Sequence, residues 1–202
     1  MRDRDLVRLY WPAELRPAFD ALFDIDEAMA DVVARSTQPA SAAIKLAWWR
    51  ERLEELDEGK IPAEPRLKAA AAELLPRGIS GAELGELEDG WVALLEETPD
   101  PERTLNRGAT LFGLAARLIG SDPPHVLAPA GRLYAAGALQ RLGLAPAASW
   151  GLTPSRSVPV AFRRLTGLAV LAKRDLRRRE PEGTPGRAWA LLRHRLTGRF
   201  PQ

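Results

Sequence analysis

Hydrophobic residues recur along this chain at intervals of three and four, which is the spacing of one face of an α-helix. The clearest stripe comprises Leu15, Phe19, Leu22, Met29 and Val33. Pro12 can open this first long helix, and Asp26 interrupts its stripe. Alternation with a period of two, the mark of a β-strand, is missing. We therefore expect an all-α chain with further helices near 41–57, 64–75, 80–97, 100–119, 123–143, 157–180 and 185–198.

The segment 145–159 is rich in Pro, Gly and Ser, but both of its sides are helical. We interpret it as a loop inside one domain, so residues 1–202 are predicted to form a single-domain helical bundle. A chain of 202 residues is long enough to bury a sizeable core. Ser80 and Glu83 have the spacing of a capping box at a helix start.

Cysteine is absent, which excludes disulfides, thiolate nucleophiles and cysteine-ligated metals. The two histidines, His125 and His194, are far apart in the sequence, so a histidine metal cluster is not expected. His194 lies between two arginines and is predicted to be exposed. No apolar run reaches the length of a membrane span, and the first residues lack the apolar core of a signal peptide. The cytoplasm is the predicted location, with peripheral contact at the inner face of the membrane left open.

Charge is distributed unevenly. Residues 1–100 carry 12 Lys or Arg and 22 Asp or Glu, whereas residues 156–202 carry 12 and 3. The asymmetry indicates either an anionic partner for the basic end or attraction between the two ends of one fold.

Asp20, Asp24, Glu27 and Asp31 form one line along the first long helix. Such a stripe can hold magnesium, which prefers oxygen ligands, or it can be a solvated face. Asp24, Glu27 and Asp31 are the candidate catalytic residues. However, no Asp or Glu occurs between Asp122 and Asp175, which argues against a second set of carboxylates facing the first.

Four segments together resemble the squalene/phytoene synthase family: FDALFDIDEAMADVV, IKLAWWRERLEEL, TLNRGATLFGLAARLIG and AGRLYAAGALQRLG. The resemblance implies a truncated isoprenoid-synthase-like bundle, in a family that condenses two prenyl diphosphates. The family's first aspartate-rich motif aligns with Ala30, Asp31 and Ala34, so Asp31 is the candidate metal ligand that remains. The second motif would begin near Leu142, just after Arg141, and no acidic residue stands there.

The run from Ile44 to Arg50 also resembles the degenerate branch of that family, which includes the mitochondrial complex I assembly factor and its bacterial relatives. This resemblance implies a protein that has lost the condensation and acts by binding, either as an assembly factor for a protein partner or by holding a prenyl-type lipid. It implies no cofactor. The alternative is an active prenyltransferase that uses Asp24, Glu27 and Asp31 as a displaced carboxylate–magnesium site.

Two further segments are candidate partner surfaces. Trp48, Trp49 and Arg50 are consecutive, and neighbours on a helix point about 100° apart, so one tryptophan should pack inward and the other should lie at a seam or a partner surface. The segment 162–180 combines an apolar stripe with Arg177, Arg178 and Arg179 at its end. It can be a core helix with cations at its C-terminus, or a surface for an anionic membrane or an acidic partner. Nucleic acid is the least favoured partner because no reading motif is present.

Overall fold

The computed structural model describes residues 2–120, 125–144, 152, 157–178 and 180–200. Within these ranges the chain is helical and contains no strand, which confirms the predicted all-α class. The α-helices are α1 (Asp3–Arg8), α2 (Arg16–Arg35), α3 (Pro39–Glu54), α4 (Pro65–Glu73), α5 (Gly81–Gly85), α6 (Leu87–Val92), α7 (Pro101–Leu118), α8 (Leu127–Leu142), α9 (Arg163–Arg177) and α10 (Pro185–Thr197). Short 3₁₀ turns occupy Ala13–Leu15, Glu55–Glu58, Leu75–Arg77 and Val160–Phe162.

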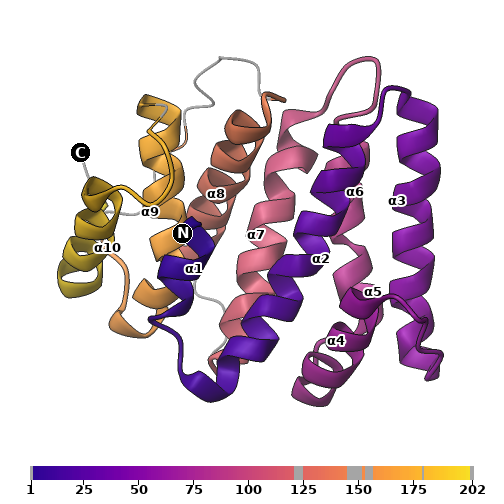
Figure 1. Cartoon of the computed structure of the whole chain (residues 1–202), viewed down its shortest axis with the longest axis horizontal. Coiled ribbons are helices and arrows are strands. Elements are labelled where there is room, and N and C mark those ends of the chain that lie inside the picture. The colour runs from indigo at the N-terminus through magenta and orange to yellow at the C-terminus, as the bar shows by residue number, and fades with distance from the viewer. Residues whose placement is uncertain (1, 121–124, 145–151, 153–156, 179, 201–202) are drawn as a thin grey trace.

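The long helices stand side by side. In Figure 1, α3 forms one edge of the molecule and α10 the other, with α2, α7, α8 and α9 between them. Helices α7, α8, α9 and α10 pack in chain order, each on the next, while α2 packs against α3, α4, α6 and α7. The short helix α1 lies against α9 and brings the N-terminus beside the C-terminal helices.

Two local features differ from the sequence prediction. The first long helix begins at Arg16 rather than Pro12, because a 3₁₀ turn precedes it, and the short α1 was not predicted. The segment 80–97 is divided into α5 and α6. The capping box at its start is confirmed, since the Ser80 hydroxyl accepts from the Glu83 amide at 3.2 Å and the Ser80 amide donates to the Glu83 carboxylate at 2.9 Å.

Helices α7 and α8 cross with their backbones in direct contact. A Cβ atom placed on Gly108 would lie 2.1 Å from the carbonyl oxygen of Gly131, and the reverse substitution meets the same obstacle. Only glycine at both positions permits this approach. The crossing holds α8 close to α7 and so fixes where the α8 side chains Tyr134 and Arg141 stand relative to α2.

Helix α9 belongs to the core. Its apolar side chains, from Leu165 to Ala172, are buried, while Arg177 at its end is exposed. The basic amphipathic segment predicted from sequence is therefore a core helix with cations in its last turn, where the helix dipole favours them. None of the helices in the described ranges has the length and apolar character needed to cross a bilayer.

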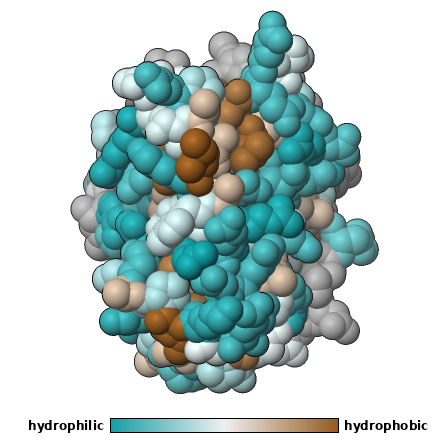
Figure 2. All heavy atoms as spheres, turned by 90° about the vertical axis from the view of Figure 1, so that its right-hand side faces the viewer, coloured by the Kyte–Doolittle hydropathy of each residue, from teal (hydrophilic) through white to brown (hydrophobic). Residues whose placement is uncertain are grey.

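Large apolar side chains also remain exposed at the two edges of the molecule. Figure 2 shows apolar patches within a mostly hydrophilic surface on the side that α3 forms. On that helix Ile44 is 72% exposed and Trp48 is 42% exposed. At the opposite edge, α10 exposes Trp189, Leu192 and Leu196.

Candidate functional site

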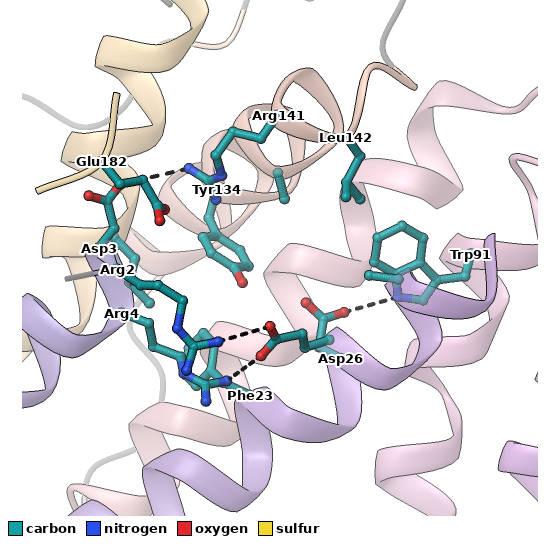
Figure 3. A pocket seen from close by; sticks show the side chains of 14 residues that line it. Arg2, Asp3, Arg4, Phe23, Asp26, Trp91, Tyr134, Arg141, Leu142 and Glu182 are labelled. Atoms are coloured by element: carbon teal, nitrogen blue, oxygen red, sulfur yellow. Dashed lines mark hydrogen bonds and ion pairs between the residues drawn. The ribbon is translucent and has the colours of Figure 1, made fainter. Parts of the chain in front are cut away.

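A cavity of about 300 Å³ lies where α1, α2, α6, α8 and α9 meet (Figure 3). Its lining combines apolar groups with charged side chains from α1, α2 and α8. The lining residues are Arg2, Asp3, Arg4, Phe23, Asp26, Glu27, Ala30, Trp91, Tyr134, Ala138, Arg141, Leu142, Leu168 and Glu182. The apolar lining residues of α2 and of α8 are mainly three, four or seven positions apart along each helix. One face of α2 and one face of α8 therefore line the same cavity.

Tyr134 and Arg141 are seven residues apart on α8 and both line the cavity. In Figure 3 the Tyr134 hydroxyl points into the space beside Asp26. Burial, with the nearby Asp26 charge, raises the pKa of Tyr134 well above its usual value. The phenol therefore stays protonated at neutral pH and can donate a hydrogen bond to a ligand.

Asp26 is the buried carboxylate that α2 contributes to the site. It accepts a hydrogen bond from the Trp91 indole Nε1 at 3.0 Å and is ion-paired with Arg107 of α7. The Arg107 guanidinium stacks on the Trp91 ring, 3.9 Å from its centroid. Asp26 is thus held by two fixed partners, and its charge is offset by a guanidinium that is itself fully buried.

Sequence reasoning placed Asp26 off the acidic stripe and did not make it a candidate. The signal was present, because a lone aspartate interrupts an otherwise apolar helix face. A charged residue on a buried face must have a partner, since an isolated buried charge is very costly. The partner is 81 residues further along the chain, so the pairing itself could not be inferred.

Three of the four carboxylates of the acidic stripe pair with arginines in or next to α1. Asp24 lies 2.5 Å from the Arg4 guanidinium, and Glu27 accepts from Arg4 at 3.0 Å and from Arg2 at 3.1 Å. One turn away, Asp20 accepts from Arg8 at 2.6 Å. Asp20, Asp24 and Glu27 therefore fasten α1 along α2, and all three side chains remain partly exposed.

Arg4 experiences two opposing effects. Burial alone would lower the pKa of its guanidinium, but the charges of Asp24 and Glu27 outweigh burial and raise that pKa. Arg4 therefore remains a cation at the rim of the cavity at neutral pH.

The candidate ligands do not converge. Of Asp24, Glu27 and Asp31, Glu27 lines the cavity, whereas Asp31 is paired with Arg35 at 3.3 Å on the same helix. Across the described residues, no group of three or more His, Asp or Glu side chains is arranged to hold a metal ion. The lining carboxylates Asp26 and Glu27 already have cationic partners.

A second buried ion network closes the cavity on the side of the C-terminal helices. Arg187 of α10 donates to Asp3 of α1 at 2.8 Å and to Asp175 of α9 at 2.5 Å. Arg141 of α8 donates to Asp175 at 2.5 Å and also lies 3.9 Å from Asp3. Four helices are joined through these charges, which explains how the acidic start of the chain and its basic end come together.

Of the adjacent tryptophans Trp48 and Trp49, one is buried and the other is exposed, as the geometry of a helix predicts. Trp49 is 7% exposed and packs inward, whereas Trp48 is 42% exposed, and their rings meet edge to face at 5.4 Å. Arg50 pairs with Glu54 at 3.0 Å and with Glu88 at 3.5 Å, and its side chain remains 47% exposed.

The basic end of the chain contains both exposed arginines and a buried histidine. Arg177 and Arg178 are exposed, and Arg179 lies outside the described residues. The expectation that His194 is exposed was wrong. Its ring is buried, with Nδ1 3.0 Å from the Arg199 carbonyl oxygen and Nε2 2.8 Å from the Thr166 hydroxyl. Burial lowers the pKa of His194, and the charge of Arg163 adds to that effect.

The site is therefore an amphiphilic cavity with fixed cations at its rim, an apolar wall and two buried, ion-paired aspartates, Asp3 and Asp26. Comparison of the chain with protein-family models, with curated proteins and with solved structures gives no match.

Proposed function

We propose that this chain is a squalene/phytoene synthase-like protein that binds one prenyl-type lipid with an anionic head group and does not condense two prenyl diphosphates. The observation that carries the proposal is the state of the carboxylates on α2. All five, Asp20, Asp24, Asp26, Glu27 and Asp31, have arginine partners in the chain. Magnesium held by these groups would have to displace arginines, including a buried one.

The size of the cavity supports the same proposal. At about 300 Å³ it is at the lower end of the range of about 300–1,000 Å³ that ligand pockets occupy. That volume suits one small ligand or a short part of a lipid chain. The condensation that the family resemblance implies needs room for two prenyl diphosphates.

The lining suits an amphiphile. Phe23, Leu142 and Leu168 offer an apolar wall for a hydrocarbon chain. A guanidinium has five N–H donors, so Arg141 can keep its pair with Asp175 and still donate to an anionic head group. The protonated phenol of Tyr134, on the same face of α8, supplies one more donor.

Calorimetry with farnesyl monophosphate and farnesyl diphosphate, each with and without magnesium, tests the proposal. We expect binding that does not require the metal. Ala138→Leu, which fills the cavity without changing its charge, should weaken binding at least tenfold, equivalent to about 1.4 kcal/mol. Ala128→Leu is the matched control, since Ala128 is an exposed alanine on the same helix.

Each other outcome is informative. Binding that requires magnesium, together with release of pyrophosphate from two substrate molecules, would establish the alternative, an active prenyltransferase. Equal binding by the Ala138→Leu and Ala128→Leu variants would move the ligand out of the cavity. No binding of either lipid by the wild type would remove the prenyl-lipid proposal.

A protein partner is the second candidate function, and the exposed apolar face of α3 favours it. Ile44 and Trp48 lie four residues apart on one line of that helix, and tryptophan is enriched among residues that dominate binding energy. In-cell photo-crosslinking from position 47, between them, should give a discrete adduct. The adduct should be lost in Ile44→Glu/Trp48→Glu while the melting temperature is retained; an unchanged adduct would contradict a role for this face.

A further inference from the structure

The outer face of α10 carries a stripe of large apolar side chains that the fold leaves uncovered. Trp189 is 67% exposed, Leu192 is 40% exposed and Leu196 is 70% exposed. Their spacing of three and four residues places them on one line along the helix. Figure 1 shows α10 at the edge of the molecule, with α9 on its inner side.

The opposite face of α10 is firmly attached, so this stripe cannot turn inward. Ala190 and Leu191 are buried, and His194 bonds to Thr166 of α9. Arg187, fully buried, joins Asp3 and Asp175. The orientation of α10 is therefore fixed. One face packs against the rest of the protein, and the other exposes Trp189, Leu192 and Leu196 to solvent.

Cations flank the stripe. Arg193 and Arg195 are exposed beside Leu192 and Leu196, and Arg199 is exposed just beyond the helix. Residues 185–202 include no Asp or Glu. Arg163 also donates to the carbonyl oxygens of Arg195 and Leu196, at 3.2 and 2.8 Å, which places another cation at the C-terminal end of α10.

We propose that this face of α10 docks on an anionic phospholipid surface. Trp189, Leu192 and Leu196 would enter the headgroup region, and Arg193, Arg195 and Arg199 would contact lipid phosphates. Helices that lie in a membrane interface combine these features: a narrow apolar face with Trp and Leu, and basic residues beside it. Tryptophan is particularly suited to this position because its ring is amphipathic. The proposal rests on α10 alone and is independent of the cavity.

A membrane fits the surface better than a protein partner does. The stripe is one helix wide, while a stable protein interface buries about 800 Å² on each side and is depleted of charge at its centre. Here three apolar side chains are bordered closely by arginines. A lipid surface accepts both, because acyl chains and phosphates lie within a few ångströms of each other.

Vesicle co-sedimentation tests the proposal. We expect the wild type to bind vesicles of phosphatidylcholine mixed with phosphatidylglycerol, to bind pure phosphatidylcholine at least tenfold more weakly, and to dissociate as salt is raised. Trp189→Gln/Leu196→Gln should reduce binding at least tenfold. Ile44→Gln/Trp48→Gln on α3 is the matched control, because it also removes one exposed tryptophan and one exposed aliphatic side chain, at the other edge of the molecule.

A second pair of variants tests the contribution of the arginines on α10. Arg193→Gln/Arg199→Gln on and just beyond α10 should weaken binding more than Arg177→Gln/Arg178→Gln, which removes two exposed cations at the end of α9. Far-UV circular dichroism and melting curves confirm that each variant is folded.

Three results would overturn the proposal: no sedimentation of the wild type with the anionic vesicles, sedimentation equal in the wild type and the α10 variant, or greater loss in the α3 variant than in the α10 variant. Concentration-dependent dimerisation that Trp189→Gln/Leu196→Gln abolishes, without any vesicle binding, would instead assign the stripe to contact with a second copy of the chain.

Discussion

Replacing Arg187 with methionine should destabilise the protein more than any surface substitution on α10. The guanidinium is fully buried, and it pairs with Asp3 at the start of the chain and with Asp175 of α9. Methionine keeps most of the side-chain length and removes the charge, so two buried carboxylates lose their shared partner. Breaking a buried pair in this way typically costs about 3–5 kcal/mol.

The lower end of that range applies here, because Arg141 still lies 2.5 Å from Asp175 and 3.9 Å from Asp3. A loss of about 3 kcal/mol in a chain of about 200 residues corresponds to a fall of about 6–12 °C in the melting temperature. Total stabilities of folded proteins are about 5–15 kcal/mol, so the variant should still fold.

Urea unfolding followed by circular dichroism measures the change. Arg193→Met is the matched control: the same substitution at an exposed position of α10, expected to change the free energy of unfolding by less than about 0.5 kcal/mol. The double variant Asp3→Asn/Arg187→Met should lose less free energy of unfolding than the two single variants lose together. Arg187→Met leaves the Asp3 carboxylate unpaired, and Asp3→Asn removes that carboxylate. Equal urea midpoints for Arg187→Met and Arg193→Met would refute the idea that this network holds the chain ends together.

The remaining predictions use the same unfolding assay. Gly108→Ala should destabilise by at least about 1–3 kcal/mol, since its methyl group meets the α8 backbone, whereas Gly113→Ala on the same helix has open space and should stabilise slightly; the reverse order would contradict the close crossing. Asp26→Asn should cost about 3–5 kcal/mol by leaving a buried guanidinium unpaired, and Asp31→Asn less than about 0.5 kcal/mol; similar costs would mean that the buried pair is not formed. Burial, reinforced by a nearby arginine, lowers the pKa of His194 below the unfolded value of about 6.5, so the unfolded state takes up the proton first and stability falls as pH drops through about 6.5. His194→Gln should remove that part of the pH dependence, and an unchanged profile would show that other groups cause it.

Helical periodicity predicted most of the long helices, but their ends depended on local detail that periodicity does not carry. The capping box at Ser80 was readable because both of its residues lie within one turn. The break between α5 and α6 at Glu86 could not be predicted from the sequence, because the spacing of apolar residues continues without interruption across it. The sequence left open whether α9 is a core helix or a docking surface, and only the structure showed that its apolar face is buried. The structure alone likewise showed which apolar face of α10 stays exposed.

The cavity shows the same limit. The spacing of Asp24, Glu27 and Asp31 correctly placed acidic residues along one helix, yet it gave no information about what faces them. In the structure, Asp24 and Glu27 pair with Arg4 of α1, and Asp31 pairs with Arg35 of its own helix. Asp26, which interrupts the apolar pattern of α2, is the carboxylate of that helix that the fold buries.

The sequence by itself determined the helical class, the placement of the long helices, the missing cysteine chemistry and the opposite charges of the two ends. Each of these depends on residue type or on neighbours within a few positions. The tertiary structure alone decided which charges meet, which helix faces are covered and where a cavity remains, since pairs such as Asp3 and Arg187 are 184 residues apart. A charge pattern constrains which partners are possible, but only the packing of helices fixes which of them come within hydrogen-bonding distance.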